Sequence, residues 1–147
     1  MTTQLFTPIT ISAHINAPLD TVWKLYTEPE HITHWNNASS DWHTPRAENN
    51  LSIGGTFNYR MEARDGSVGF DFGGTYTHIQ QYHRISYVMA DGRNVTIIFE
   101  RTEQYTQVTI TFDAEHTNPL EMQRDGWQAI LDNFKTYAET WAAQHNA

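Results

Sequence analysis

The residues of this chain best suited to chemistry are three histidines that lie close to two tryptophans. His31 and His34 are three residues apart and would share one helical face, and His43 follows Trp35 and Trp42. Imidazoles that come together in space can bind zinc. No carboxylate stands at a signature spacing, however, and a loop separates His43 from the other two histidines. The alternatives are a cavity mouth with the two tryptophans as a movable lid, or a surface histidine pair beside a packed tryptophan. We predict no metal site.

A second group with possible chemistry is a set of carboxylates on strand rows that should face outward: Asp71, Asp113, Glu62 and Glu100. Two carboxylates on neighbouring strands are the acid and base of many glycosidases. Arg60, Arg64 and Arg101 lie in the same part of the sequence, so we interpret the carboxylates as ion-pair partners on a solvated face.

Other catalytic patterns are weak. Gly69, Gly73 and Gly74 fall inside a strand pattern, where they are typical of a bend and not of a phosphate-binding loop. No serine stands in a nucleophile elbow. The chain contains no cysteine, which excludes thiolate chemistry and disulfides. We predict no catalytic residues and no cofactor.

The composition limits the partners. The 147 residues carry a net charge of −8, and the 9 lysines and arginines are scattered singly, which argues against nucleic acid. No run approaches the ~20 apolar residues that span a bilayer, and the first twenty residues lack a signal-peptide pattern. We expect one cytoplasmic domain over residues 1–147 with no linker or repeat.

The longest expected element is a C-terminal helix from Asn118 to His145, about 27 residues or about 40 Å. Asn118-Pro119 is typical of a helix start, with Glu121 reaching back to cap it. Large apolar residues recur at three- and four-residue steps: Leu120, Trp127, Leu131, Phe134, Ala138 and Trp141. Such a face must be covered by another part of the chain.

The covering element is a sheet, because most of the remaining chain alternates between apolar and polar residues. Strands are expected over 7–15, weakly over 40–45, and then over 56–63, 68–76 with a row continuing to His78, 85–89, 95–99 and 108–114. Two short helices should lie between Pro18 and His34. Short turns such as Asp65-Gly66 and Asp91-Gly92 imply an antiparallel meander. The prediction is an α+β domain with a curved antiparallel sheet of six or seven strands wrapped around the C-terminal helix.

Several segments resemble the START-like (SRPBCC) helix-grip superfamily, also called Bet v 1-like. These are Ile15-Asn16-Ala17-Pro18, Val22-Trp23, Thr27-Glu28-Pro29-Glu30, Ile53-Gly54-Gly55-Thr56-Phe57, Phe70-Asp71-Phe72-Gly73-Gly74-Thr75-Tyr76, Arg124-Asp125-Gly126-Trp127 and Ile130-Leu131-Asp132-Asn133-Phe134. Together they look like the branch named after the activator of the Hsp90 ATPase (homologue 1-like), in its short single-domain form. The resemblance spans residues 9–142.

The resemblance implies the same sheet-around-helix fold, often with a cavity between the sheet and the long helix. Members bind lipids, polyketides, flavonoids or hormones, and some are cyclases. The eukaryotic Hsp90 activator has a further N-terminal domain that makes much of its chaperone contact, and this chain has no room for one.

The candidate ligand-binding residues are the two tryptophans near the histidines, the inward strand rows and the helix face that they meet: Trp35, Trp42, Phe57, Tyr59, Met61, Phe70, Phe72, Tyr76, Tyr87, Phe99, Trp127, Leu131 and Phe134. They either line a cavity or fill it as a core. The tyrosines favour the cavity, because a dry core would have to supply a partner for each hydroxyl.

Three functions follow from this pattern. The first is binding of a small hydrophobic molecule that is lipid-, polyketide- or flavonoid-like. The second is a cyclase or dehydratase that would use His34, His43, His78 or a cavity tyrosine for proton transfer. The third is an interaction module that contacts a chaperone or forms a homodimer. We favour binding over catalysis.

Overall fold

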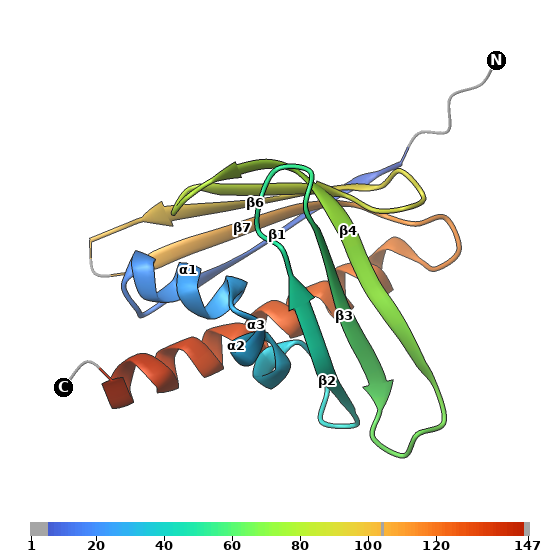
Figure 1. Ribbon diagram of the computed structural model, residues 1–147, viewed down its shortest axis with the longest axis horizontal. Coiled ribbons are helices and arrows are strands. Elements are labelled where there is room, and N and C mark those ends of the chain that lie inside the picture. Colours follow the sequence, from blue (N-terminus) through green and yellow to red (C-terminus); the bar gives the residue numbers. More distant parts are fainter. Residues whose placement is uncertain (1–5, 104, 146–147) are drawn as a thin grey trace.

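The computed structural model describes residues 6–103 and 105–145, which form one seven-stranded sheet and three helices. The strands are β1 Pro8–Ile15, β2 Trp42–Asn49, β3 Thr56–Ala63, β4 Gly69–Gln80, β5 Arg84–Val88, β6 Asn94–Arg101 and β7 Thr106–Asp113. The helices are α1 Leu19–Thr27, α2 Pro29–Trp35 and α3 Leu120–His145. The predicted α+β fold is confirmed (Figure 1).

All strand pairs are antiparallel, in the order β1-β7-β6-β5-β4-β3-β2. Strands β2 to β7 form a meander of adjacent strands. β1 instead pairs with β7, with Ile9 opposite Phe112 and Ile11 opposite Ile110. Because β1 and β2 are the two edges, α1 and α2 must carry the chain across the open side of the sheet.

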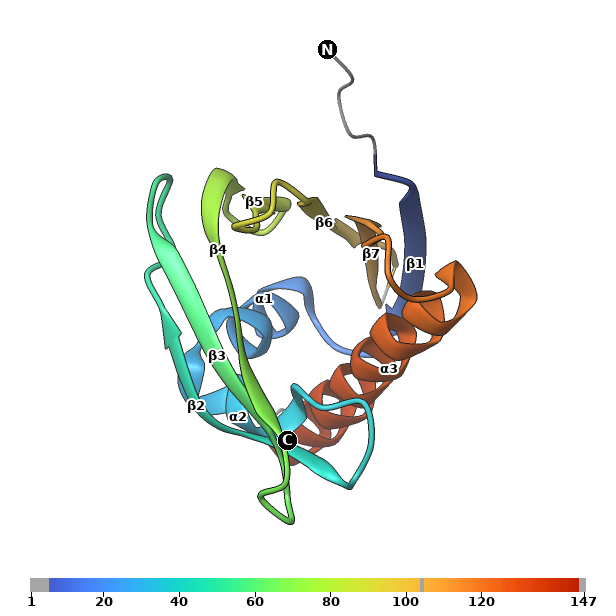
Figure 2. The ribbon, with the colours of Figure 1, turned by 90° about the vertical axis from the view of Figure 1, so that its right-hand side faces the viewer.

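The sheet curls so that its apolar face is concave. Figure 2 shows the strands as an arc from β2 round to β1, with all three helices on the inner side. A single core of buried residues joins the sheet to α3 through Leu131, Phe134 and Ala138. Among the described residues, no helix is both long and apolar enough to span a membrane.

The two short helices meet at Glu28, which is both the C-cap of α1 and the N-cap of α2. Pro29 occupies the first turn of α2, where its missing N–H costs nothing. A residue that precedes proline is pushed out of the α region, and Glu28 is extended, with φ −83° and ψ 126°. The predicted corner is confirmed.

The start of α3 differs from the prediction in its details. The helix begins at Leu120, and the side chain of Gln123, not Glu121, binds the preceding turn. Its Nε2 donates to the carbonyl of Asn118 at 2.8 Å and to that of Glu115 at 3.1 Å. Leu120, expected on the apolar face, is the first residue of the helix and is 48% exposed.

β2 and β4 also depart from the expected pattern. β2 runs to Asn49, beyond the weak strand expected over 40–45. In β4, the pairing with β5 shifts between Tyr76 and His78, so the inward row continues at Ile79, opposite Ile85. The prediction that His78 follows Tyr76 inward is therefore wrong, and His78 is exposed. Val68, expected in the same inward row, precedes the strand and is exposed as well.

Candidate functional site

A cavity of about 260 Å³ lies between the concave face of the sheet and α3. Most of its wall comes from large apolar and aromatic side chains of β3 to β7 and α3, and α1 and α2 close one part of it. Its lining residues are Tyr26, Thr27, Trp35, Asn36, Asn49, Phe57, Tyr59, Met61, Phe70, Phe72, Tyr76, Ile85, Tyr87, Met89, Arg93, Ile97, Ile110, Trp127, Ile130 and Leu131.

Ten of the thirteen predicted ligand-binding residues line this cavity: Trp35, Phe57, Tyr59, Met61, Phe70, Phe72, Tyr76, Tyr87, Trp127 and Leu131. The structure therefore brings them together, whereas contact with a ligand stays a prediction. Phe70 lines the cavity and is nevertheless 47% exposed, so it lies where the cavity meets the surface.

The other three predicted residues do not line the cavity. Phe99 and Phe134 are 1% and 0% exposed and belong to the packed core, where the rings of both meet that of Tyr26. Trp42 lies at the start of β2, with its ring 5.9 Å from that of Phe70. Alternation along a strand predicts which side a residue faces, and it does not say how deep in the core the residue lies.

The proposed lid role of Trp35 is wrong. This side chain is 3% exposed, and its Nε1–H donates to the carbonyl of Leu25 at 2.9 Å. Its ring packs at 5.0 Å on Tyr26 and at 4.8 Å on Phe134. A tryptophan that is held by a hydrogen bond and by ring contacts on two sides is a fixed part of the cavity wall.

Trp127 is the large aromatic side chain that α3 contributes to the cavity wall. Its ring stacks on Phe112 at 4.1 Å with planes 7° apart, and meets Phe72 edge-on at 6.0 Å. Such contacts add to the energy of simple burial and hold the ring in one orientation. The indole thus gives a rigid apolar wall against which a planar molecule could pack.

The polar groups of the cavity form a hydrogen-bonded series. The hydroxyl of Tyr76 donates to Oδ1 of Asn49 at 2.5 Å, and Nδ2 of Asn49 donates to the carbonyl of Thr27 at 2.7 Å. A hydrogen bond also joins the hydroxyls of Tyr59 and Tyr76. This series links β3 and β4 to the end of β2 and to the C-terminus of α1.

Burial keeps the cavity phenols protonated. It raises the pKa of Tyr76 to about 12, although the hydrogen bonds between Tyr76 and the side chains of Tyr59 and Asn49 act in the opposite direction. Burial also raises the pKa of Tyr26, Tyr59 and Tyr87, and neighbouring phenols raise each of them further. At neutral pH all four side chains are protonated hydroxyls, each with a proton available for a hydrogen bond.

Half of the cavity wall was not predicted: Tyr26, Thr27, Asn36, Asn49, Ile85, Met89, Arg93, Ile97, Ile110 and Ile130. Ile85, Ile97 and Ile110 stand on the predicted inward rows, so the alternating pattern contained a signal for them. Asn49 ends β2, beyond the strand expected over 40–45. Asn36 follows α2 and Arg93 precedes β6, and periodicity gives no direction at such positions.

The three histidines do not converge. Nδ1 of His31 shares a hydrogen bond of 2.8 Å with the hydroxyl of Tyr137, and His34 stacks on the same ring at 5.7 Å. His43 lies on β2, with its Nε2 3.9 Å from Oε1 of Glu62 on β3.

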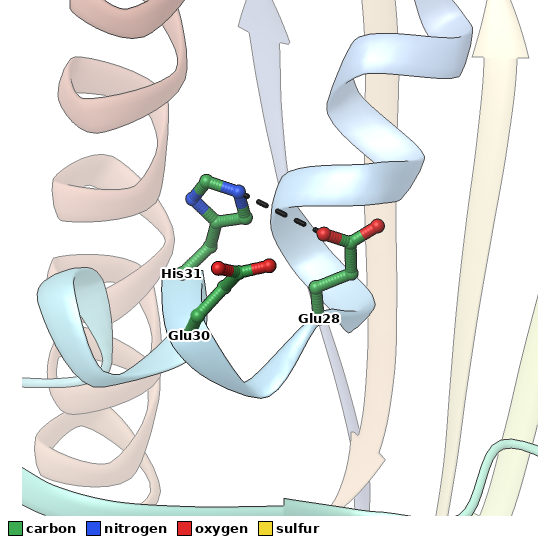
Figure 3. Close-up of side chains that lie close together, drawn as sticks. All are labelled: Glu28, Glu30 and His31. Atoms are coloured by element: carbon green, nitrogen blue, oxygen red, sulfur yellow. Dashed lines mark ion pairs between the residues drawn. The ribbon is translucent and has the colours of Figure 1, made fainter.

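A different group brings His31 close to two carboxylates (Figure 3). One atom each from Glu28, Glu30 and His31 lies within 4.8 Å of the others, and the His31 Nε2 to Glu28 Oε1 distance is 3.8 Å. Burial lowers the pKa of His31 even though both carboxylates act to raise it. Glu30 is exposed, and we assign this group no metal.

The family profile described as "Activator of Hsp90 ATPase homolog 1-like protein" (AHSA1) matches residues 16–139. The chain belongs to this AHSA1-like family. The recognised resemblance is therefore confirmed. No curated protein matches this AHSA1-like chain.

Solved structures of similar proteins share the fold of this chain. The solution structure of the AHSA1-like protein from Aeromonas hydrophila is 45% identical, covers 95% of this chain and 96% of its own, and has a TM-score of 0.88. A protein from Cytophaga hutchinsonii is 46% identical, with 93% and 95% coverage and a TM-score of 0.79. A crystal structure from Nitrosomonas europaea, 17% identical with 92% and 96% coverage and a TM-score of 0.79, shows the fold alone.

In this AHSA1-like chain, three carboxylates on the outer face of the sheet bind an arginine side chain or a backbone N–H: Glu62, Asp71 and Asp113. Arg60 donates through Nε to Oε2 of Glu62 at 2.9 Å, and its Nη1 is 3.8 Å from Oδ1 of Asp71. Asp113 accepts a hydrogen bond from the backbone N–H of Asn94 at 2.9 Å. For Glu62 and Asp71 the ion-pair interpretation is correct, whereas within the described residues Asp113 binds a backbone N–H and no arginine.

Proposed function

We propose that this protein binds a small, largely apolar molecule in the cavity between the sheet and α3. The single observation that carries the proposal is the cavity itself, about 260 Å³ with a mainly aromatic and aliphatic wall. Ligand cavities are concave, mostly apolar and equipped with a few polar groups that orient the ligand. This cavity combines an apolar wall with the Tyr76–Asn49 hydrogen-bond series.

The energy of binding would come from removal of apolar ligand surface from water, at about 25 cal/mol per Å². The volume lies just below the ~300 Å³ at which typical ligand cavities begin. A molecule of two fused rings therefore suits the cavity better than a long-chain lipid. The family includes ligand-binding START-like domains, which supports the proposal without naming the ligand.

The test is a titration of ¹⁵N-labelled protein with naphthalene, followed by two-dimensional NMR. We expect saturable shifts at residues of the cavity wall, such as Trp127 and Tyr87, and none on the outer face of the sheet. Because α3 forms one wall, Ile130→Trp should fill part of the cavity and weaken binding at least tenfold.

The matched control is Met122→Trp, which adds the same side chain to an exposed position on the same helix and should leave the affinity unchanged. Both variants must first show a native spectrum. Absence of saturable shifts in the wild-type protein, or equal affinity of the Ile130→Trp variant and the wild type, would contradict the proposal.

A further inference from the structure

Two tyrosine hydroxyls in the cavity take no part in the hydrogen bonds of the described residues. Tyr76 donates to Asn49, and Tyr59 shares a hydrogen bond with Tyr76. Within the described part of the chain, neither Tyr26 nor Tyr87 has a hydrogen-bond partner for its hydroxyl, although both side chains line the cavity.

Neither hydroxyl is among the fully buried polar atoms that lack a partner, so both are accessible from the cavity. A ligand that covered them without offering an acceptor would leave each hydroxyl unpaired, at a cost of about 1–3 kcal/mol. Phenylalanine would give the same ring contacts without that cost. The rings of both residues are already well packed. Tyr26 meets Trp35 at 5.0 Å, and Tyr87 meets Phe57 at 4.7 Å. The structure therefore gives a reason for the two rings, whereas the two hydroxyls still require a partner.

The two side chains reach the cavity from different elements. Tyr26 comes from α1, and Tyr87 comes from β5, where it pairs with Tyr76 of β4. The rings of Tyr76 and Tyr87 are 6.3 Å apart and perpendicular. All three side chains line the same cavity.

The charged residue in the cavity wall, Arg93, bears on which ligand group could accept hydrogen bonds from the two hydroxyls. Its Nε donates to Oδ2 of Asp91 at 2.7 Å. The guanidinium is thus paired with a carboxylate before any ligand enters. An anionic ligand would lose its hydration without gaining an unpaired cation, which is unfavourable. A neutral oxygen acceptor suits two hydroxyl donors and an apolar wall.

We infer that the ligand carries a neutral, carbonyl-type oxygen, and that the hydroxyls of Tyr26 and Tyr87 donate hydrogen bonds to it. The ligand is then a small cyclic ketone or a related aromatic carbonyl compound, whose apolar body packs against Trp127 and Phe72. This inference rests on the proposed function and narrows it to one class of molecule.

The test uses two probes that differ by one group. Tetralin is a two-ring hydrocarbon, and 1-tetralone replaces one of its CH₂ groups with a carbonyl. Affinities for both are measured by NMR titration with the wild-type protein and with a Tyr26→Phe, Tyr87→Phe double variant. The ratio of the two affinities in one protein, compared with the same ratio in the other, isolates the contribution of the hydroxyls.

A net hydrogen bond of about 1 kcal/mol corresponds to about a fivefold change in affinity. We therefore expect the preference for 1-tetralone over tetralin to fall about 25-fold in the double variant, which lacks both hydroxyls. Tyr105→Phe, which removes an exposed hydroxyl outside this cavity, should leave the preference unchanged. In the wild-type protein, the carbonyl stretch of bound 1-tetralone should shift to lower frequency than in an apolar solvent. This infrared readout also serves if the double variant does not fold.

Two failures remain distinguishable. If both probes bind but the preference is the same in the double variant, or the carbonyl stretch does not shift, the inference is overturned and the proposed function stands. If neither probe binds the wild-type protein, the proposed function is contradicted together with the inference.

Discussion

Asn49 connects three parts of the molecule through one amide. Its Oδ1 accepts from Tyr76 and its Nδ2 donates to the carbonyl of Thr27, so Asn49→Ala removes one hydrogen bond from each of two partly buried groups. Each such loss costs about 1–3 kcal/mol. We expect the free energy of unfolding, measured in urea, to fall by about 2–4 kcal/mol. The control is Asn58→Ala at an outward position of β3, expected within about 0.5 kcal/mol of wild type. Equal losses in both variants would contradict the prediction.

The buried phenols predict instability at high pH. The unfolded pKa of tyrosine is about 10, and the folded pKa of Tyr76 is about 12. The folded state therefore binds more protons between these values, and stability falls as pH rises from about 10 towards 12. Urea unfolding at increasing pH, with tyrosinate absorbance recorded in parallel, should show phenol ionisation and unfolding together. Ionisation of all tyrosines near pH 10 in a protein that is still folded would contradict this prediction.

Single residues also mark the limit of sequence reasoning. The inward direction of Tyr59, Tyr76 and Tyr87 follows from alternation along their strands, and the structure confirms that they line the cavity. The same alternation places Phe99 inward, but tertiary packing buries it fully in the core. Depth depends on which elements lie above a residue, and a period of two contains no information on that.

At the scale of the elements, two glycines should respond to alanine in opposite directions. At Gly74 of β4 a Cβ would lie 2.9 Å from Cδ2 of Tyr87 and 2.9 Å from the carbonyl oxygen of Val88, whereas at Gly126 of α3 nothing lies within 4 Å. We expect Gly74→Ala to lower the unfolding free energy by about 1–3 kcal/mol. Gly126→Ala should raise it by about 1 kcal/mol through helix propensity. Thermal and urea unfolding measure the change in unfolding free energy of both variants. A Gly74→Ala variant as stable as the wild type would contradict the close packing of Tyr87 and Val88 against Gly74.

Strands with clear alternation of apolar and polar residues could be predicted from the sequence. Strands whose extent depends on pairing with a neighbouring strand could not. The bounds of β3 coincide with the predicted 56–63, because four apolar residues alternate there. β2 contains Arg46 and Glu48 and has little apolar alternation, so most of its length depends on pairing with β3. The shift in β4 after Tyr76 likewise arises from pairing with β5, which local sequence does not record.

At the scale of the whole molecule, one core connects every element that surrounds the cavity. Buried residues of the sheet, α1, α2 and α3 belong to the same cluster. The polar series through Asn49 and the hydrogen bonds from Nδ2 of Asn133 on α3 to the carbonyl of Trp35 and to Oδ1 of Asn37 cross between these elements. Loss of any one element would therefore expose the others, which predicts a single domain that unfolds in one step.

This cooperativity determines how a ligand would act on the protein. A molecule that binds only the folded state stabilises it by RT ln(1 + [L]/Kd), or about 2.7 kcal/mol at a hundredfold excess over Kd. For a chain of this size, that raises Tm by about 5–10 °C. Calorimetry should show one transition that moves as a unit with 1-tetralone, and the slope of unfolding in urea should not change. The Ile130→Trp variant should show at most about half of this shift at the same ligand concentration, whereas Met122→Trp should shift as the wild type does. Two separate transitions, only one of them sensitive to the ligand, would contradict a cavity built on a single cooperative core.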